Sequence, residues 1–148
     1  MIKLDAIDST NDYLRKLILK KKPTTPTVVM SQYQKKGNGQ RGQVWTSQAG
    51  KNLMFSLYMP NFTLPTKEVL SINKIVSVCL LHWLSSFQLP NICVKWPNDI
   101  LSGDSKLAGI LIESNVLQST ANSIIIGVGL NVNQVEFQNL PNATSMQL

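Results

Sequence analysis

Short segments of β-branched and apolar residues outnumber helical segments in this chain, and this ratio constrains the fold more than any other feature. We expect strands at residues 26–34, 52–60, 92–96, 99–114 and 123–133. The fourth of these segments is a hairpin that turns at residues 102–105. Most of the strands can pair with a neighbour in the sequence. The pattern therefore predicts an α+β fold, with a mixed, mainly antiparallel sheet and helices packed on it.

Two segments have the periodicity of helices. The first follows the cap-type sequence DSTN, where Leu14, Leu17 and Ile18 recur at helical spacing before Pro23. The second covers residues 66–87 and is so rich in apolar residues that we expect a largely buried helix. Its inner faces would carry Val69, Leu70, Ile75, Val76, Cys79, Leu80, Trp83, Leu84 and Phe87.

The length and composition indicate one folded domain. A chain of 148 residues fits a single domain over residues 1–148, and an apolar fraction of 43% with a charged fraction of 15% is typical of a globular protein. The last residues, NLPNATSMQL, do not resemble a packed terminal element. We therefore expect the domain to be truncated at its C-terminal end.

The cysteines and the hydropathy pattern bear on location. Cys79 and Cys93 lie in apolar contexts without a CxxC motif or a nearby histidine, so we expect both to be buried small hydrophobic residues. No signal peptide opens the chain, and no uninterrupted apolar run reaches membrane-spanning length. These absences predict a cytoplasmic protein without a membrane partner.

The net charge of +6, from 14 Lys and Arg against 8 Asp and Glu, favours anionic partners. Much of this charge lies in one segment, residues 15–22. No aromatic residues that could stack on bases are interleaved with these lysines. The segment is therefore more typical of a solvated helix end than of a surface that binds nucleic acid.

The sequence GNGQRGQVW is the first candidate for ligand binding. Its glycines, Gly37, Gly39 and Gly42, permit backbone conformations and close approaches that other residues do not. Arg41 adds a fork of donors suited to phosphate or carboxylate. It is not a Walker loop, because no GK[ST] closes it. A mobile surface connection is the alternative interpretation.

The sequence KWPNDILSGDSKLAGILIES is the second candidate. Regular strand alternation would place Lys106 on the same face as Ala108, Ile110 and Ile112. A lysine at the end of an apolar face either extends to solvent or points into a cleft. Gly109 favours the cleft, because a missing side chain often marks a place where a ligand or another backbone lies close.

Two further motifs carry polar groups that could bind a ligand. Asn131 and Asn133 in GVGLNVN could offer amide contacts, or could simply belong to the transition from strand to loop. Ser9, Thr10 and Asn11 in DSTN fit a helix cap, and such a helix start can also bind a small polar ligand.

Groups for covalent or metal chemistry are missing from the pattern. His82 is the single histidine and lies among apolar residues, so no Ser-His-Asp or Cys-His arrangement can be assembled. Metal-ligand spacing is also absent. An enzyme with this sequence would work through positioning and positive charge, as in phosphate transfer or acid activation.

The motifs DSTN, GxGxxGxxW, KWPND, KLAGIL and GVGLNVN, in this order, together resemble those of biotin protein ligases, from about AIDSTN to NATS. The resemblance implies a class II synthetase-like biotin/lipoate ligase catalytic domain. It implies activation of biotin by ATP with Mg²⁺ to biotinyl-5'-AMP, and then transfer of biotin to a lysine of a biotin carboxyl carrier protein domain. A homodimer is compatible with it. No DNA binding is expected, because no helix-turn-helix precedes the first motif.

The resemblance also assigns roles by position. Lys106 would contact the reacting carboxylate and phosphate, Arg41 would act with it, and Asp99 would help to position a metal ion or the incoming lysine. No resident metal ligand is expected. The residues expected to bind biotin, ATP or the adenylate are Ser9, Thr10, Asn11, Gln34, Gly37, Asn38, Gly39, Gln40, Lys95, Asn98, Lys106, Gly109 and Asn131.

The glycine loop departs from the family pattern. The usual loop reads GRGRxGRxW, whereas this chain has Asn38, Gln40 and Gln43 at the arginine positions and retains only Arg41. Amides donate hydrogen bonds but carry no charge, so we expect faster loss of the adenylate.

Three alternatives stay open at this point. The first is a lipoate or octanoate ligase or transferase, which resembles the family in fold and in carboxyl activation. The second is a biotin-binding fragment without productive catalysis. The third is a nucleic-acid-binding module, which only the +6 charge favours.

Overall fold

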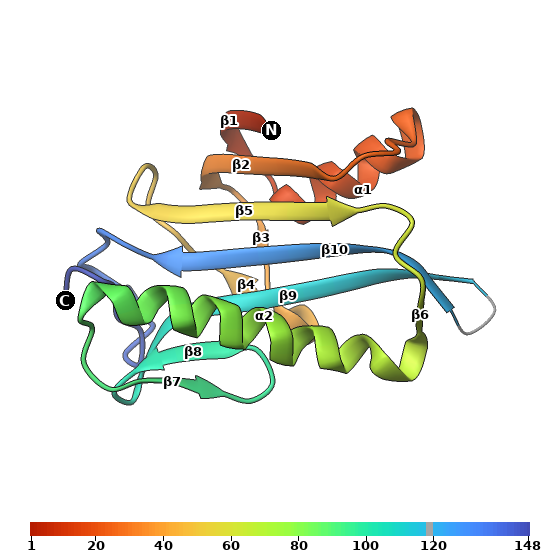
Figure 1. Cartoon of the computed structure of the whole chain (residues 1–148). Helices are drawn as coiled ribbons and strands as arrows, with labels where there is room; N and C mark the ends of the chain where they lie inside the picture. The colour runs from red at the N-terminus through yellow and green to blue at the C-terminus, as the bar shows by residue number, and fades with distance from the viewer. Residues whose placement is uncertain (118–119) are drawn as a thin grey trace.

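The computed structural model describes residues 1–117 and 120–148 (Figure 1). Single 3₁₀ turns cover Gln40–Gly42, Thr66–Glu68 and Ser85–Phe87. The strands and helices, in chain order, are β1 (Ile2–Ile7), α1 (Thr10–Lys21), β2 (Thr27–Gln34), β3 (Gly37–Asn38), β4 (Val44–Trp45), β5 (Asn52–Met59), β6 (Leu64–Pro65), α2 (Val69–Leu84), β7 (Ile92–Lys95), β8 (Asp99–Ser102), β9 (Ser105–Leu117) and β10 (Thr120–Asn131).

One large sheet organises the molecule. Its strand order is β1-β2-β5-β10-β9-β8-β7, with β6 added on β10, and β3 and β4 form a separate hairpin. Within the described residues, β1 and β2 pair in parallel and the other pairs are antiparallel. The predicted α+β fold with a mixed, mainly antiparallel sheet is therefore confirmed.

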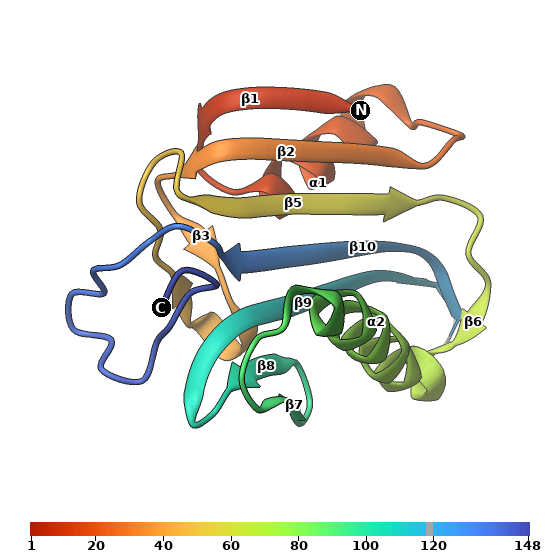
Figure 2. The same ribbon diagram turned by 60° about the vertical axis from the view of Figure 1, so that its left-hand side comes forward.

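The helices lie on opposite faces of this sheet. Helix α2 covers one face, and α1 with the β3–β4 hairpin lies on the other (Figures 1 and 2). Alternation along β10 supplies both faces: Ile124 and Ile126 pack with Val76 of α2, whereas Ile125 packs with Leu14 of α1. The face that carries α1 is therefore the one on which the cap motif and the glycine loop can meet.

Helix α1 begins as the sequence predicts. Ser9 is its N-cap, and the Ser9 hydroxyl accepts a hydrogen bond from the Asp12 N–H at 3.4 Å. The helix ends at Lys21, before Lys22 in the left-handed conformation. Lys20 and Lys21 in the last turn match the negative end of the helix dipole.

Strand β1 was not predicted. It is an edge strand with the sequence IKLDAI, and its neighbour β2 lies across helix α1 in the sequence. Its exposed lysine and aspartate break the apolar pattern, as is common where a strand has one partner only. Its parallel pairing therefore depends on the tertiary fold and not on a local signal.

Helix α2 is less buried than its composition predicts. Leu84 is fully buried and Val76 packs on the sheet, but Leu70, Ile75, Val78 and Trp83 are exposed, as is Phe87 in the 3₁₀ turn that follows the helix. The prediction of a largely buried helix is therefore wrong, because apolar residues occupy the outer surface as well as the inner one.

Both cysteines are exposed and free, which corrects the expectation that Cys79 and Cys93 are buried. Cys79 lies on the outer surface of α2, and Cys93 lies on β7 at the end of the sheet. In the described residues one helix, Thr66–Phe87, is long and apolar enough to cross a membrane by length and composition, although Lys74 interrupts its apolar run. These two criteria are weak evidence, since a helix that packs on a soluble core also meets them.

The C-terminal segment packs against β9, although its sequence does not resemble a packed terminal element. The Lys106 N–H donates to the Asn142 carbonyl at 2.7 Å, and the Thr144 N–H donates to the Lys106 carbonyl at 3.0 Å. Ser145 is buried, and the Met146 N–H donates to the Asn131 carbonyl. The backbone at Lys106 is thus held from both sides, by β8 and by this segment.

Candidate active site

A β-bulge sets the direction of Lys106. Ile100 on β8 pairs with Ala108, but Leu101 pairs with Lys106, so Leu107 is an extra residue on β9. The bulge moves Lys106 to the face of Gly109, opposite to the buried Ala108. The predicted shared face with Ala108, Ile110 and Ile112 is therefore wrong, whereas the prediction that the lysine points into a cleft is confirmed.

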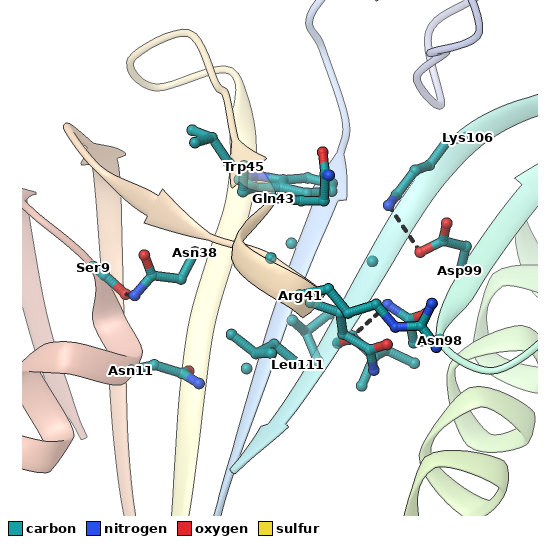
Figure 3. A pocket seen from close by; sticks show the side chains of 18 of the residues that line it. Ser9, Asn11, Asn38, Arg41, Gln43, Trp45, Asn98, Asp99, Lys106 and Leu111 are labelled. Carbon is teal, nitrogen blue, oxygen red and sulfur yellow. Dashed lines mark hydrogen bonds and ion pairs between the residues drawn. The ribbon is translucent and has the colours of Figure 1, made fainter.

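This cleft is a cavity of about 530 Å³ between α1, the β3–β4 hairpin and the face of the sheet that carries α1 (Figure 3). Ser9 and Asn11 lie at one end, and Lys106 and Asp99 lie at the other. Of the predicted site residues it gathers Ser9, Thr10, Asn11, Gln34, Asn38, Gly39, Gln40, Arg41, Asn98, Asp99, Lys106 and Gly109.

Five polar residues form what we call the cradle: Ser9, Thr10, Asn11, Gln34 and Ser56, all buried. Thr10 donates to Gln34 Oε1 from its backbone N–H at 2.7 Å and from its hydroxyl at 3.0 Å. Ser56 Oγ lies 2.7 Å from Thr10 Oγ1 and also donates to Asn11 Oδ1. A buried polar group is costly unless it is hydrogen-bonded, so this network fixes the side chains before any ligand binds.

The glycine loop folds as the short β3–β4 hairpin with one 3₁₀ turn. Gly39 N–H donates to the Gln43 carbonyl at 2.7 Å, and Arg41 at the tip has a left-handed backbone with φ 52°. Asn38 donates to Asp12 Oδ1 at 3.0 Å and lies 3.5 Å from Ser9 Oγ. The hairpin is thus tied to the start of α1 and places Arg41 at the cavity.

The opposite end of the cavity carries the charged pair. Lys106 Nζ lies 2.8 Å from Asp99 Oδ1 and 5.8 Å from the centre of the Trp45 ring. Asn98 and Ile110 exchange hydrogen bonds, Ile110 N–H to the Asn98 carbonyl at 2.9 Å and Asn98 Nδ2 to the Ile110 carbonyl at 3.1 Å. These bonds hold the β7–β8 turn beside the lysine.

Trp45 is a cavity residue that the predictions omitted. Its ring lies over Gly129 and Gly109, which face each other on β10 and β9. A Cβ at Gly129 would lie 2.5 Å from the ring, so the two glycines make the room for it. The close neighbour that Gly109 indicated is therefore this ring together with the side chain of Lys106. The final tryptophan of the GxGxxGxxW motif was the signal for this position.

Other omitted lining residues come from motifs that the sequence analysis had identified. They are Gln43, Val44, Trp96, Pro97, Ile110, Leu111, Gly127, Val128 and Gly129. Lys74 Nζ of α2 lies over the face of the Trp96 ring, 5.5 Å from the centre of the ring.

Three predicted residues do not line this cavity among the described residues. Gly37 lies just behind it, where a Cβ would be 3.0 Å from Gln34 Nε2. Lys95 is exposed at the end of β7. Asn131 is buried, and its Nδ2 donates to the Thr144 carbonyl at 2.9 Å, so it holds the C-terminal segment. Lys95 and Asn131 therefore lie outside the lining of this cavity.

The described part of the cavity offers few ligands for a resident metal ion. In residues 1–117 and 120–148, no three His, Cys, Asp or Glu side chains gather as possible ligands. Asp99 is the single carboxylate that lines the cavity in this part of the chain. Mg²⁺ commonly binds through one or two carboxylates together with substrate phosphates, and Asp99 is one such carboxylate.

The match to a family model classifies the chain. Residues 4–131 match the biotin/lipoate A/B protein ligase family. The chain belongs to this family. It is 34% identical over 129 residues to the bifunctional ligase/repressor BirA of Escherichia coli (strain K12), a match that covers 87% of this chain and 39% of that protein.

Solved structures of ligases in this family have the same fold. The biotin protein ligase from Aquifex aeolicus in complex with biotin and ATP has a TM-score of 0.74 and 28% identity, and the match covers 98% of this chain and 58% of that one. The biotin protein ligase from Leishmania major in complex with biotin has a TM-score of 0.78 at 24% identity, over 99% and 62% of the two chains. This chain therefore spans less than two thirds of the length of each relative.

Proposed function

We propose that this chain is the catalytic core of a biotin protein ligase, which joins biotin to ATP and then transfers biotin to a protein lysine. The observation that carries this proposal is the polarity of the cradle. The Thr10 N–H can only donate, so Gln34 turns its Oε1 to Thr10 and keeps its Nε2 as a donor. Asn11 Oδ1 lies over Gly127 at the cavity wall, as an acceptor.

A cyclic urea matches this set of groups. Its carbonyl accepts hydrogen bonds and its two N–H groups donate them, which suits donors from Gln34 and Ser9 together with the Asn11 acceptor. The dithiolane ring of a lipoyl group has neither N–H nor C=O, so it could not bond to Gln34 Nε2, the Ser9 hydroxyl or the second lone pair of Asn11 Oδ1. The cradle therefore favours biotin over lipoate.

The charged end of the cavity suits the reacting groups. In the first step, a carboxylate oxygen of biotin attacks the α-phosphorus of ATP, and the bond to pyrophosphate breaks. Both reactants are anions, and Lys106 offsets their repulsion and the charge that develops on the phosphoryl oxygens. Asp99 holds the Lys106 ammonium at the cavity before the anions arrive. Arg41 at the hairpin tip adds a second positive group.

In the second step, the amine of an acceptor lysine attacks the acyl carbon, AMP leaves, and the amine loses a proton. We propose a biotin carboxyl carrier protein domain as the acceptor. The relatives support these reactants and this acceptor, because the Aquifex aeolicus structure holds both biotin and ATP and two relatives are named biotin–[acetyl-CoA-carboxylase] ligases. Cytoplasmic location, the absence of DNA binding and a homodimer stay predictions.

The test is calorimetry with biotin and then ATP, followed by mass spectrometry for biotinyl-5'-AMP. We expect biotin to bind alone and the adenylate to form when ATP and Mg²⁺ are added. A parallel reaction with lipoate should release no pyrophosphate; release with lipoate alone would replace the proposal by the lipoate alternative. Biotin binding without adenylate would identify a binding fragment without catalysis.

A further inference from the structure

Glu113 on β9 lies in the segment KWPNDILSGDSKLAGILIES but is not one of the predicted site residues, yet it contacts the cradle. Asn11 Nδ2 donates to Glu113 Oε2 at 2.7 Å. The other carboxylate oxygen, Oε1, lies 3.9 Å from Arg15 of α1, which also pairs with Asp12. Glu113 is thus held between Asn11 and Arg15, next to the cavity and not in its lining.

The contact fixes the orientation of the Asn11 amide. A carboxylate can only accept hydrogen bonds, so the Asn11 nitrogen must face Glu113 and its oxygen must face the other way. On that side, Ser56 donates a hydrogen bond to Asn11 Oδ1. Gly127 provides the space for this oxygen, since a Cβ at Gly127 would overlap it. An inverted amide would bring its oxygen against the carboxylate, where two acceptors repel.

We propose that Glu113 is a positioning residue that sets the hydrogen-bond polarity of the cradle and thereby selects a ligand with a ring N–H. Glu113 keeps Asn11 Oδ1 at the cavity as an acceptor, which favours a cyclic urea over a ring of the same shape with an oxygen at that position. This inference rests on the proposed function. It adds a specificity determinant that acts through Asn11 and does not touch the ligand.

The test compares two kinds of ligand across variants of this contact. The ligands are biotin and its cyclic carbamates, in which either ureido N–H is replaced by a ring oxygen. Glu113→Gln keeps the size and one acceptor, but its amide can also donate, so both orientations of Asn11 become allowed. The informative ligand is the carbamate whose ring oxygen replaces the N–H that faces Asn11. We expect its Kd relative to that of biotin to fall about tenfold in Glu113→Gln. The reason is that the charged hydrogen bond that holds Asn11 in one orientation is exchanged for a neutral one.

The matched control is Glu68→Gln, which removes the same charge in the turn before α2, on the other face of the sheet. This variant should keep the wild-type ratio. The double variant Asn11→Asp with Glu113→Gln should restore selectivity, since the amide introduced on β9 can then donate to one oxygen of the new carboxylate and leave the other at the cavity. The single variant Asn11→Asp should bind biotin worst, because two carboxylates would face each other.

The outcomes separate the two proposals. Failure of the wild-type protein to bind biotin would overturn the proposed function and this inference with it. Biotin binding by the wild type, with an unchanged ratio in folded Glu113→Gln, would overturn the inference alone. If Glu113→Gln does not fold, the double variant decides. A Kd ratio of carbamate to biotin that is not restored in the double variant would contradict the role of Glu113.

Discussion

The two ends of the cavity hold their polar groups in different ways. In the cradle, the side chains of Thr10, Gln34 and Ser56 are buried and hydrogen-bonded to one another without a ligand. At the other end Lys106 is 38% exposed and bonded to one partner, and Arg41 lies at the exposed tip of a small hairpin. The cradle is therefore organised in advance, whereas the charged end can rearrange around its ligands.

This difference suggests that the cradle recognises the ligand and that the charged end carries out the reaction. A prearranged site loses little conformational entropy on binding, which suits the selection of one small ring. The charged end must hold two anions in the first step and release a nucleotide in the second, so groups with few fixed bonds suit it. We expect changes in the cradle to act on biotin affinity, and changes at the charged end to act on rate and adenylate release.

The largest effect should come from Lys106→Ala. Loss of the ammonium should slow adenylate formation roughly ten- to a thousandfold, the range expected for one lost transition-state contact. Biotin affinity should change little, because the cradle lies at the other end. Single-turnover measurement of adenylate gives the rate, with calorimetry for affinity. Lys95→Ala is the matched control, as this exposed lysine does not line the cavity. An unchanged rate in Lys106→Ala would remove the lysine from the chemistry.

Two glycines on β10 test the rigidity of the two ends directly. A Cβ at Gly127 would overlap Asn11, which is fixed by Ser56 and Glu113. We expect Gly127→Ala to lower the free energy of unfolding by about 1–3 kcal/mol, as for other overpacked sites. Urea denaturation measures this change.

Gly129→Ala is the matched variant, two residues along the same strand. Its Cβ would meet the Trp45 ring, which belongs to the small β3–β4 hairpin and can move with it. We expect a loss below about 1 kcal/mol, because a surface hairpin can shift more easily than a packed helix start. Equal losses for the two variants would contradict the difference between the ends.

A smaller effect is expected from Thr10→Val in the cradle. The variant keeps the shape and the backbone N–H but removes the hydroxyl that Gln34 and Ser56 contact. We expect biotin to bind roughly tenfold more weakly, the result of one unsatisfied buried group. The rate of adenylate formation at saturating biotin should stay near that of the wild type. Thr25→Val, in the exposed connection before β2, serves as the control.

The sequence predicted the membership of this site better than its geometry. The cap motif, the glycine loop, KWPND and KLAGIL meet at one cavity. They could be identified in the sequence because each is a short run of residues whose chemistry suggests ligand binding. The face of Lys106 could not be predicted, since the extra residue Leu107 depends on the register between β8 and β9. The burial of α2 failed for a related reason, as apolar residues surround the helix and composition cannot identify the side that packs.

The role of Asn131 shows a further limit. An asparagine after an apolar strand can bind a ligand or a backbone carbonyl, and only the path of the C-terminal segment selects the second role here. Glu113 is the opposite case, a residue that was not predicted for the site but contacts the cradle. It reads as an ordinary charged residue on a strand, and its importance follows from a helix more than a hundred residues earlier in the sequence.

The smallest expected effect concerns the loop that has lost its arginines. Gln40 lines the cavity at the position where the family pattern has arginine. We expect Gln40→Arg to slow the release of biotinyl-5'-AMP a few-fold, up to about tenfold, because a charge-assisted bond to phosphate is stronger than that of an amide. Gln32→Arg, on the exposed side of β2, adds the same charge away from the cavity and should leave release unchanged. A direct off-rate measurement decides, and equal rates in all three proteins would mean that the charged end already holds the adenylate through Lys106 and Arg41 alone.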